Sequence, residues 1–139
     1  MAIRATMWGM VVTVVAAFVA TVILGILAFF QLLLAAGAPF GRMAWGGRQP
    51  PVLPPPLRVV SSFGAFILAT FLIAVLARAG IVRGFLPAEV VGPVTWGIAG
   101  MLGLAAVAKL TSRGRAERLV MAPLTAVASV ATALVAAFA

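Results

Sequence analysis

Four long apolar stretches, separated by short basic or proline-rich segments, are the feature that most constrains the fold of this chain. They cover residues 7–36, 59–77, 89–108 and 119–138, and a helix needs ~20 residues to cross a hydrocarbon core of ~30 Å. Charged residues make up only 9% of the chain, against ~25% in soluble domains. Lipid offers the backbone no hydrogen-bond partners, so each stretch is predicted to be a helix. The sequence therefore predicts an all-α integral membrane protein, a four-transmembrane-helix bundle forming a single domain over residues 1–139.

The segment between the first two stretches, residues 37–58, is the one long segment that cannot be a membrane helix. It holds six of the nine prolines, four glycines, three arginines and Trp45. Proline lacks a backbone donor and clashes with the preceding turn, so this Pro/Gly-rich first connector interrupts the helices. Because proline also restricts the unfolded chain, we expect an ordered connector that folds back on the bundle end, with Trp45 packed and the arginines reaching carbonyls or headgroup phosphates.

This connector is the most promising place for a functional site, although it could instead only close the bundle. Its candidate functional residues are Pro39, Gly41, Arg42, Trp45, Gly46, Gly47, Arg48, Pro54 and Arg58.

The third apolar stretch carries Gly97, Gly100 and Gly103 at intervals of three. Small residues let the backbones of two membrane helices approach closely, so we expect these glycines to lie against another helix. On this interpretation Gly100→Leu disrupts the bundle or its assembly more than Leu102→Ala does.

The basic residues are distributed unevenly along the chain. The first and third connectors carry seven of the ten lysines and arginines, and the N-terminus and second connector carry three. Cytoplasmic loops are enriched in these residues, which predicts both termini outside and the two basic connectors inside. The opposite orientation, with both ends in the cytoplasm, is common among chains with an even number of spans. The composition, rich in Ala, Val, Gly and Arg, favours a bacterial inner membrane.

The third connector, residues 109–118, is the most basic short segment. Its Arg113, Arg115 and Arg118 are candidates for binding anionic lipid headgroups, at ~1 kcal/mol per basic residue near an anionic surface. The same arginines are explained equally well as a signal that only orients the chain in the membrane. Glu117, four residues after Arg113, is expected to be a solvated surface partner worth ~0–1 kcal/mol. The other acid, Glu89, is expected at a helix N-terminus.

The residues that most enzymes use are missing from this chain. It has no cysteine, histidine or tyrosine, and its two acids lie in different connectors. Pairs of serine or cysteine with histidine, the usual metal ligands and paired carboxylates are therefore excluded, and a Ser112–Lys109 pair, three residues apart in a basic loop, is a chance arrangement. The sequence predicts no enzyme, no cofactor and no metal site. Nucleic acid is not an expected partner, because the positive charge is divided among loops.

Two short motifs are similar to those of a known group of proteins. The first is Gly37-Ala38-Pro39, Gly41, Trp45-Gly46-Gly47, Leu53-Pro54 and Leu57-Arg58; the second is Ser112, Glu117-Arg118 and Pro123. Together they resemble uncharacterised small bacterial four-span membrane proteins. The resemblance implies a four-helix membrane fold with basic cytoplasmic loops, and it implies no activity and no catalytic residues.

Three functions agree with these observations. The first is a non-enzymatic accessory or scaffolding subunit that packs with itself or with a larger membrane assembly. The alternative is a small transporter or channel for a lipophilic or neutral solute, with a cavity lined by Gln31, Ser61, Ser62 or Thr70. The third is binding of anionic membrane lipids through the arginine-rich connectors.

Overall fold

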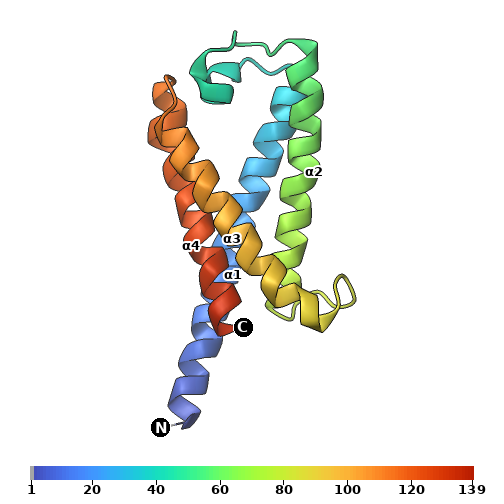
Figure 1. The fold of residues 1–139 in the computed structure, drawn as a ribbon, viewed down its shortest axis with the longest axis vertical. Helices are drawn as coiled ribbons and strands as arrows, with labels where there is room; N and C mark the ends of the chain where they lie inside the picture. Colours follow the sequence, from blue (N-terminus) through green and yellow to red (C-terminus); the bar gives the residue numbers. More distant parts are fainter. Residues whose placement is uncertain (1) are drawn as a thin grey trace.

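The computed structural model describes residues 2–139, which form four long helices and no strand (Figure 1). The helices are α1 (Ala2–Ala35), α2 (Pro55–Arg78), α3 (Ala88–Leu110) and α4 (Ala122–Phe138), the last preceded by a π-helical turn, η3 (Glu117–Met121). Counting η3 and α4 as one, all four are long and apolar enough to cross a membrane. The all-α, four-helix membrane fold predicted from hydropathy is confirmed.

The helices form two hairpins, α1–α2 and α3–α4. α1 packs along both α2 and α4, and α3 packs along α4. Figure 1 shows the hairpins meeting near the end that holds the termini and diverging toward the other end, where the first connector crosses between them. α1 has 34 residues, about 51 Å at 1.5 Å per residue, and its N-terminal turns project beyond the end of α4 (Figure 1).

The helix ends differ from the limits of the apolar stretches for physical reasons. α1 begins at Ala2, because a helix continues past the hydrocarbon boundary while its backbone bonds are made. α2 begins at Pro55, within the proline run that we expected to be non-helical. Proline is tolerated in the first turn because the amide group it lacks has no partner there in any helix. Glu89 lies in the first turn of α3, as predicted.

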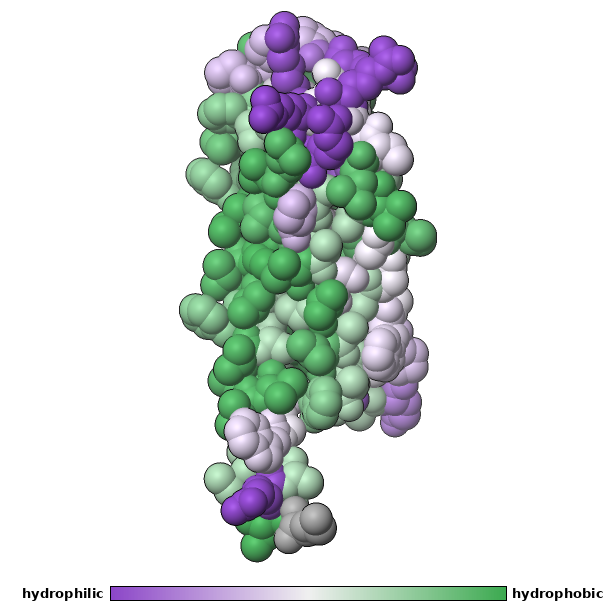
Figure 2. All heavy atoms as spheres, turned by 90° about the vertical axis from the view of Figure 1, so that its left-hand side faces the viewer, coloured by the Kyte–Doolittle hydropathy of each residue, from purple (hydrophilic) through white to green (hydrophobic). Residues whose placement is uncertain are grey.

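The core of the bundle combines small and branched residues. Its fully buried members include Ala20 and Leu24 on α1, Val75 on α2, and Ala128 and Val135 on α4. Alanine lets two helices approach closely in lipid, where no hydrophobic force pushes them together. Figure 2 shows the outer face as an apolar band beneath a polar cap at the connector end.

Two arginines at the ends of α2 bind the last carbonyls of neighbouring helices. Arg58 donates from Nε to the Ala35 carbonyl oxygen at 2.9 Å, and Arg78 donates to the Ala136 carbonyl oxygen at 3.0 Å. These carbonyls lack partners within their own helices, and a cation is favourable at a helix C-terminus. Each end of α2 is thereby attached to another helix.

The orientation predicted from charge can be tested with single cysteines, because the chain has none of its own. Arg48 and Arg115 are exposed in the first and third connectors, and Arg83 is exposed in the second. We expect Arg83→Cys to react with a membrane-impermeant maleimide in intact cells, and Arg48→Cys and Arg115→Cys to react only after permeabilisation. The reverse pattern would overturn the predicted orientation.

Candidate functional site

The first and third connectors contact each other at the end of the bundle. The backbone nitrogen of Arg113 donates to the Gly46 carbonyl oxygen at 3.1 Å, and the Gly46 nitrogen donates to Oε2 of Glu117, 71 residues away, at 3.1 Å. Gly46 thus uses both of its backbone groups on the third connector. We call this contact, between residues 42–47 and 112–117, the connector junction.

Glu117 lies at the centre of the connector junction and is 4% exposed. Its Oε2 also accepts a hydrogen bond from Oγ of Ser112 at 2.5 Å, and its Oε1 lies 3.5 Å from Nζ of Lys109. Burial of a carboxylate is unfavourable unless donors and a counter-charge replace water. The expectation that Glu117 is a solvated surface residue is therefore wrong, since the first connector, which is remote in sequence, covers the carboxylate and donates the Gly46 amide to it.

Glycine is required where the two backbones meet. A Cβ on Gly114 would lie 2.6 Å from the Arg42 carbonyl oxygen, and a Cβ on Gly47 would overlap the Gly114 backbone. Gly46 and Gly47 also adopt φ of 81° and 72°, which favours glycine over any other residue. The connector junction is thus a backbone-to-backbone contact.

Trp45 adopts a left-handed backbone conformation, with φ of 54°. For a bulky residue this conformation costs of order 1–3 kcal/mol and persists only where surrounding contacts impose it. Here the conformation precedes the turn that aims the Gly46 amide at Glu117. The contact with the third connector therefore imposes this strained conformation on the first connector.

The first connector has a small core of its own. Leu34, Ala44 and Leu53 are buried together, and the Gly41 nitrogen donates to the Pro51 carbonyl oxygen at 2.8 Å. The connector therefore folds back on itself and over the end of α1.

The remaining candidates in the first connector have varied surroundings. Trp45 is 38% exposed, so the prediction that its ring is packed away is wrong. Arg58 reaches a carbonyl as predicted, whereas Arg42 and Arg48 are exposed and make no side-chain hydrogen bond or ion pair within residues 2–139. Pro39 is exposed; Pro54 is extended and accepts, through its carbonyl, the first backbone bonds of α2.

The three arginines of the third connector lie beside the connector junction. Arg118 donates to the Ser112 carbonyl oxygen at 3.2 Å, and all three residues, Arg113, Arg115 and Arg118, are exposed. They lie at the same end of the bundle as Arg42 and Arg48, because the first and third connectors contact each other there. Binding of lipid headgroups by this surface stays a prediction.

A cavity of about 280 Å³ lies between the first connector and α3, next to the connector junction. We call it the connector cavity; its lining is Gln31, Ala44, Trp45, Gly46, Ala105, Ala108, Lys109 and Glu117. Oε1 of Gln31 is buried and has no hydrogen-bond partner within the described chain. Buried polar groups are normally satisfied. This oxygen lies toward α2, since a Cβ on Gly64 would be 3.5 Å from it, and the Lys109 side chain lines the same cavity.

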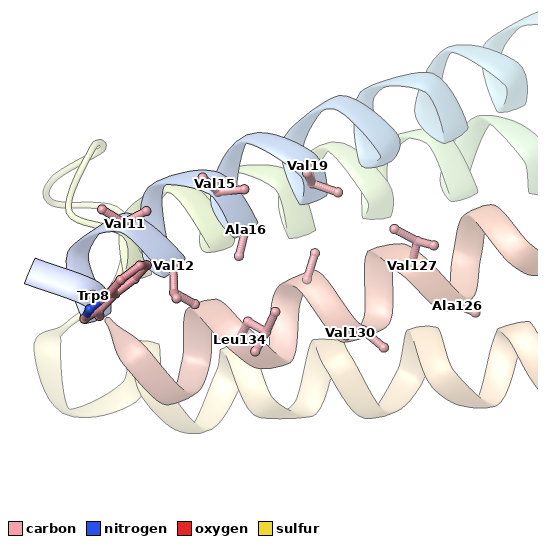
Figure 3. A pocket seen from close by; sticks show the side chains of 11 residues that line it. Trp8, Val11, Val12, Val15, Ala16, Val19, Ala126, Val127, Val130 and Leu134 are labelled. Atoms are coloured by element: carbon pink, nitrogen blue, oxygen red, sulfur yellow. The ribbon is translucent and has the colours of Figure 1, made fainter. Parts of the chain in front are cut away.

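A second, larger hollow of about 580 Å³ lies between the first half of α1 and α4. Figure 3 shows that its walls are valine, alanine, leucine and tryptophan side chains from these two helices, from Trp8 to Val19 and from Ala126 to Leu134. It faces outward in the apolar band, so lipid chains are sufficient to fill it. The lining has no group that could do chemistry.

The three glycines predicted to pack, Gly97, Gly100 and Gly103, have different surroundings. A Cβ on Gly103 would lie 3.2 Å from Oγ of Ser129 on α4, whereas Cβ atoms on Gly97 and Gly100 would meet no neighbouring helix of the described chain within 4 Å. Of these three, only Gly103 therefore contacts another helix of the described chain.

The contacts among Glu117, Lys109 and Ser112 were not predicted from the sequence. Gln31 was predicted only as one of several possible cavity residues. The signal for Glu117 is its isolation, since it is the one acid in the most basic segment of the chain. A single carboxylate among several arginines can indicate specific hydrogen-bond donors for that carboxylate as well as a solvated ion pair.

Comparisons of this chain with family models, with curated proteins and with solved structures give no match. The resemblance of the two connector motifs to small four-span proteins stays a prediction.

We expect Gly114→Ala to detach the first connector from the third, because the added Cβ would lie 2.6 Å from the Arg42 carbonyl oxygen. Overpacking of this kind costs ~1–3 kcal/mol. Trypsin should then cleave after Arg42 and Arg48 several-fold faster in detergent solution. Gly100→Ala is the matched control, because its Cβ would have open space; equal cleavage rates in both variants would show that the connector junction does not hold the connector.

Proposed function

The outer face of α3 has an unusual surface for a helix in lipid. Gly97 and Gly100 lie next to each other on it, with Trp96 and Leu104 beside them, 52% and 74% exposed. Glycine adds no apolar area against lipid and is ~1 kcal/mol less favourable than alanine in a helix interior. Two glycines between two large side chains make a hollow that fits the ridge of another helix.

We propose that this protein is a non-enzymatic accessory or scaffolding subunit of a bacterial inner membrane, which packs the glycine face of α3 against a transmembrane helix of another chain. The observation that carries the proposal is the open space at Gly97 and Gly100. Both positions are exposed and point away from the core of the bundle. The expected partner is an apolar helix, contributed by a second copy or by a larger assembly, and the basic connectors are expected to face the cytoplasm.

Transport of a small lipophilic or neutral solute is the second candidate, and the connector cavity is the observation that favours it. Of the four polar residues named as possible cavity linings, Gln31 lines this cavity, whereas Ser61, Ser62 and Thr70 do not. Toward the termini the bundle is filled by Leu24, Leu27 and Leu102, which are at most 5% exposed. A solute would therefore cross only if the two hairpins separated.

Photo-cross-linking in native membranes tests the accessory function. A diazirine analogue of leucine at position 104 reports on the glycine face, and the same analogue at Phe66, 72% exposed on α2, is the control. We expect protein adducts at position 104 at least several-fold above those at position 66, and their loss with Gly100→Leu, which fills the hollow. Adduct mass distinguishes a second copy of the 14.2 kDa chain from a different partner; adducts to lipid alone at both positions would contradict the proposal.

Stability measurements separate loss of association from loss of folding. Leu102 is 3% exposed, so Leu102→Ala should lower the free energy of unfolding by ~2–5 kcal/mol. A Cβ at position 100 meets no neighbouring helix of the described chain within 4 Å, so Gly100→Leu should leave the stability of the isolated protein nearly unchanged. This order reverses the one expected from sequence, and a large loss of stability in Gly100→Leu would show that the glycine face packs within the chain.

A further inference from the structure

The connector cavity combines two polar groups that are available to a ligand. The Lys109 ammonium lies 3.5 Å from Oε1 of Glu117 and makes no hydrogen bond within residues 2–139. Charge-assisted hydrogen bonds are usually 2.7–2.9 Å long, so this ion pair leaves the ammonium donors free. Gln31 adds a side-chain amide with a buried, unpaired oxygen, and an amide can present either its oxygen or its nitrogen to a ligand.

The charges around the cavity favour an anion. Oε2 of Glu117 already accepts two hydrogen bonds, from Ser112 and Gly46. The unused donors are the Lys109 ammonium and the Gln31 amide nitrogen, and the oxygens without a hydrogen bond within residues 2–139 are Oε1 of Glu117 and Oε1 of Gln31. Glu117 is the one acid at this end of the bundle, and it is accompanied by seven lysines and arginines of the first and third connectors. An anion would enter a region of net positive charge.

The cavity lies at the depth where a lipid changes from headgroup to chain. Lys109 is the second-last residue of α3, and Gln31 is four residues before the end of α1, about 6 Å along its axis. Ala105 and Ala108 provide an apolar wall below the ammonium, and Trp45 provides an aromatic edge that is partly exposed. Tryptophan is favoured at this interface because its ring is apolar and its N–H is polar.

We propose that the connector cavity binds an amphiphilic anion, a phosphate or carboxylate head on an alkyl chain. Lys109 and Gln31 bind the head, Trp45 covers it, and the chain leaves along α3 between the diverging hairpins. The volume, about 280 Å³, is near the lower limit of ~300–1,000 Å³ for small-molecule pockets. It therefore holds a headgroup and the beginning of a chain, while the rest lies in the bilayer. This site is separate from the glycine face of α3, and neither proposal depends on the other.

Fluorescence of Trp45 reports directly on the cavity. Trp8 and Trp96, the other two tryptophans, are 65% and 52% exposed and can be replaced by phenylalanine. The protein in a neutral maltoside detergent is titrated with dodecyl phosphate, dodecanoate, inorganic phosphate, monododecanoyl glycerol and dodecyltrimethylammonium. The neutral and cationic probes correct for partitioning into the micelle.

We expect saturable changes in Trp45 emission with the two alkyl anions, and at least ten-fold weaker binding of the other three probes. Loss of a hydrogen bond to a charged group costs ~1.5–3 kcal/mol, so Gln31→Leu and Lys109→Gln should each weaken binding by about ten-fold or more. Arg115→Gln is the matched control, since it removes an exposed charge outside the cavity. Gln31→Leu leaves the Glu117 pair intact and keeps the test valid if Lys109→Gln loosens the connector junction.

Three results would overturn the proposal. Equal loss of binding in Arg115→Gln and Gln31→Leu would indicate association with the whole basic surface. Equal affinity for inorganic phosphate and dodecyl phosphate would indicate an anion site with no role for the chain. Equal response to monododecanoyl glycerol, or no response to any probe, would exclude recognition of an anionic head.

Discussion

The buried carboxylate of Glu117 is the interaction on which the connector end of this protein depends. Its partners are the Gly46 amide, the Ser112 hydroxyl and the Lys109 ammonium, and together they replace the water that a carboxylate would otherwise bind. Because Gly46 belongs to the first connector and Lys109 to α3, the carboxylate joins the α1–α2 hairpin to the α3–α4 hairpin where the helices themselves diverge. Removing one partner of such a buried group leaves an uncompensated charge, which is far more destabilising than loss of an exposed ion pair.

The connector junction also determines the shape of the connector cavity. The left-handed backbone at residues 45–47 presents the Gly46 amide to Glu117 and places Trp45 over the cavity rather than in a core. Arg58 adds a second attachment by binding the last carbonyl of α1, that of Ala35. The first connector is therefore held near its end, by Arg58, and in its middle, by the third connector, which makes it a fixed surface and not a tether. A fixed basic surface can keep its charges at a constant depth relative to the headgroups of a bilayer.

The small residues of the bundle serve two different purposes. Several on α1 and α4 face inward and allow close packing within the chain, as Ala20 and Ala128 do with no exposed surface. Those at Gly97 and Gly100 face outward into open space. In lipid, where association depends on close van der Waals contact, an outward hollow provides a place for a partner helix. On our two proposals, this face packs against another protein and the connector cavity binds an anion.

Hydropathy alone determined the class of this protein, since 20-residue apolar stretches leave the backbone no alternative to helices in lipid. The prolines and glycines of residues 37–58 likewise determined that the first connector is not helical across its middle, although the helix already begins at Pro55. The sequence could not determine the environment of Glu117, because its local neighbours are exposed arginines and its decisive partner lies 71 residues away. Nor could spacing show which glycines of α3 face inward: intervals of three drift around a helix of 3.6 residues per turn, so Gly103 meets α4 while Gly97 and Gly100 turn outward. Those outcomes depend on how the two hairpins cross, and only the tertiary structure decides that crossing.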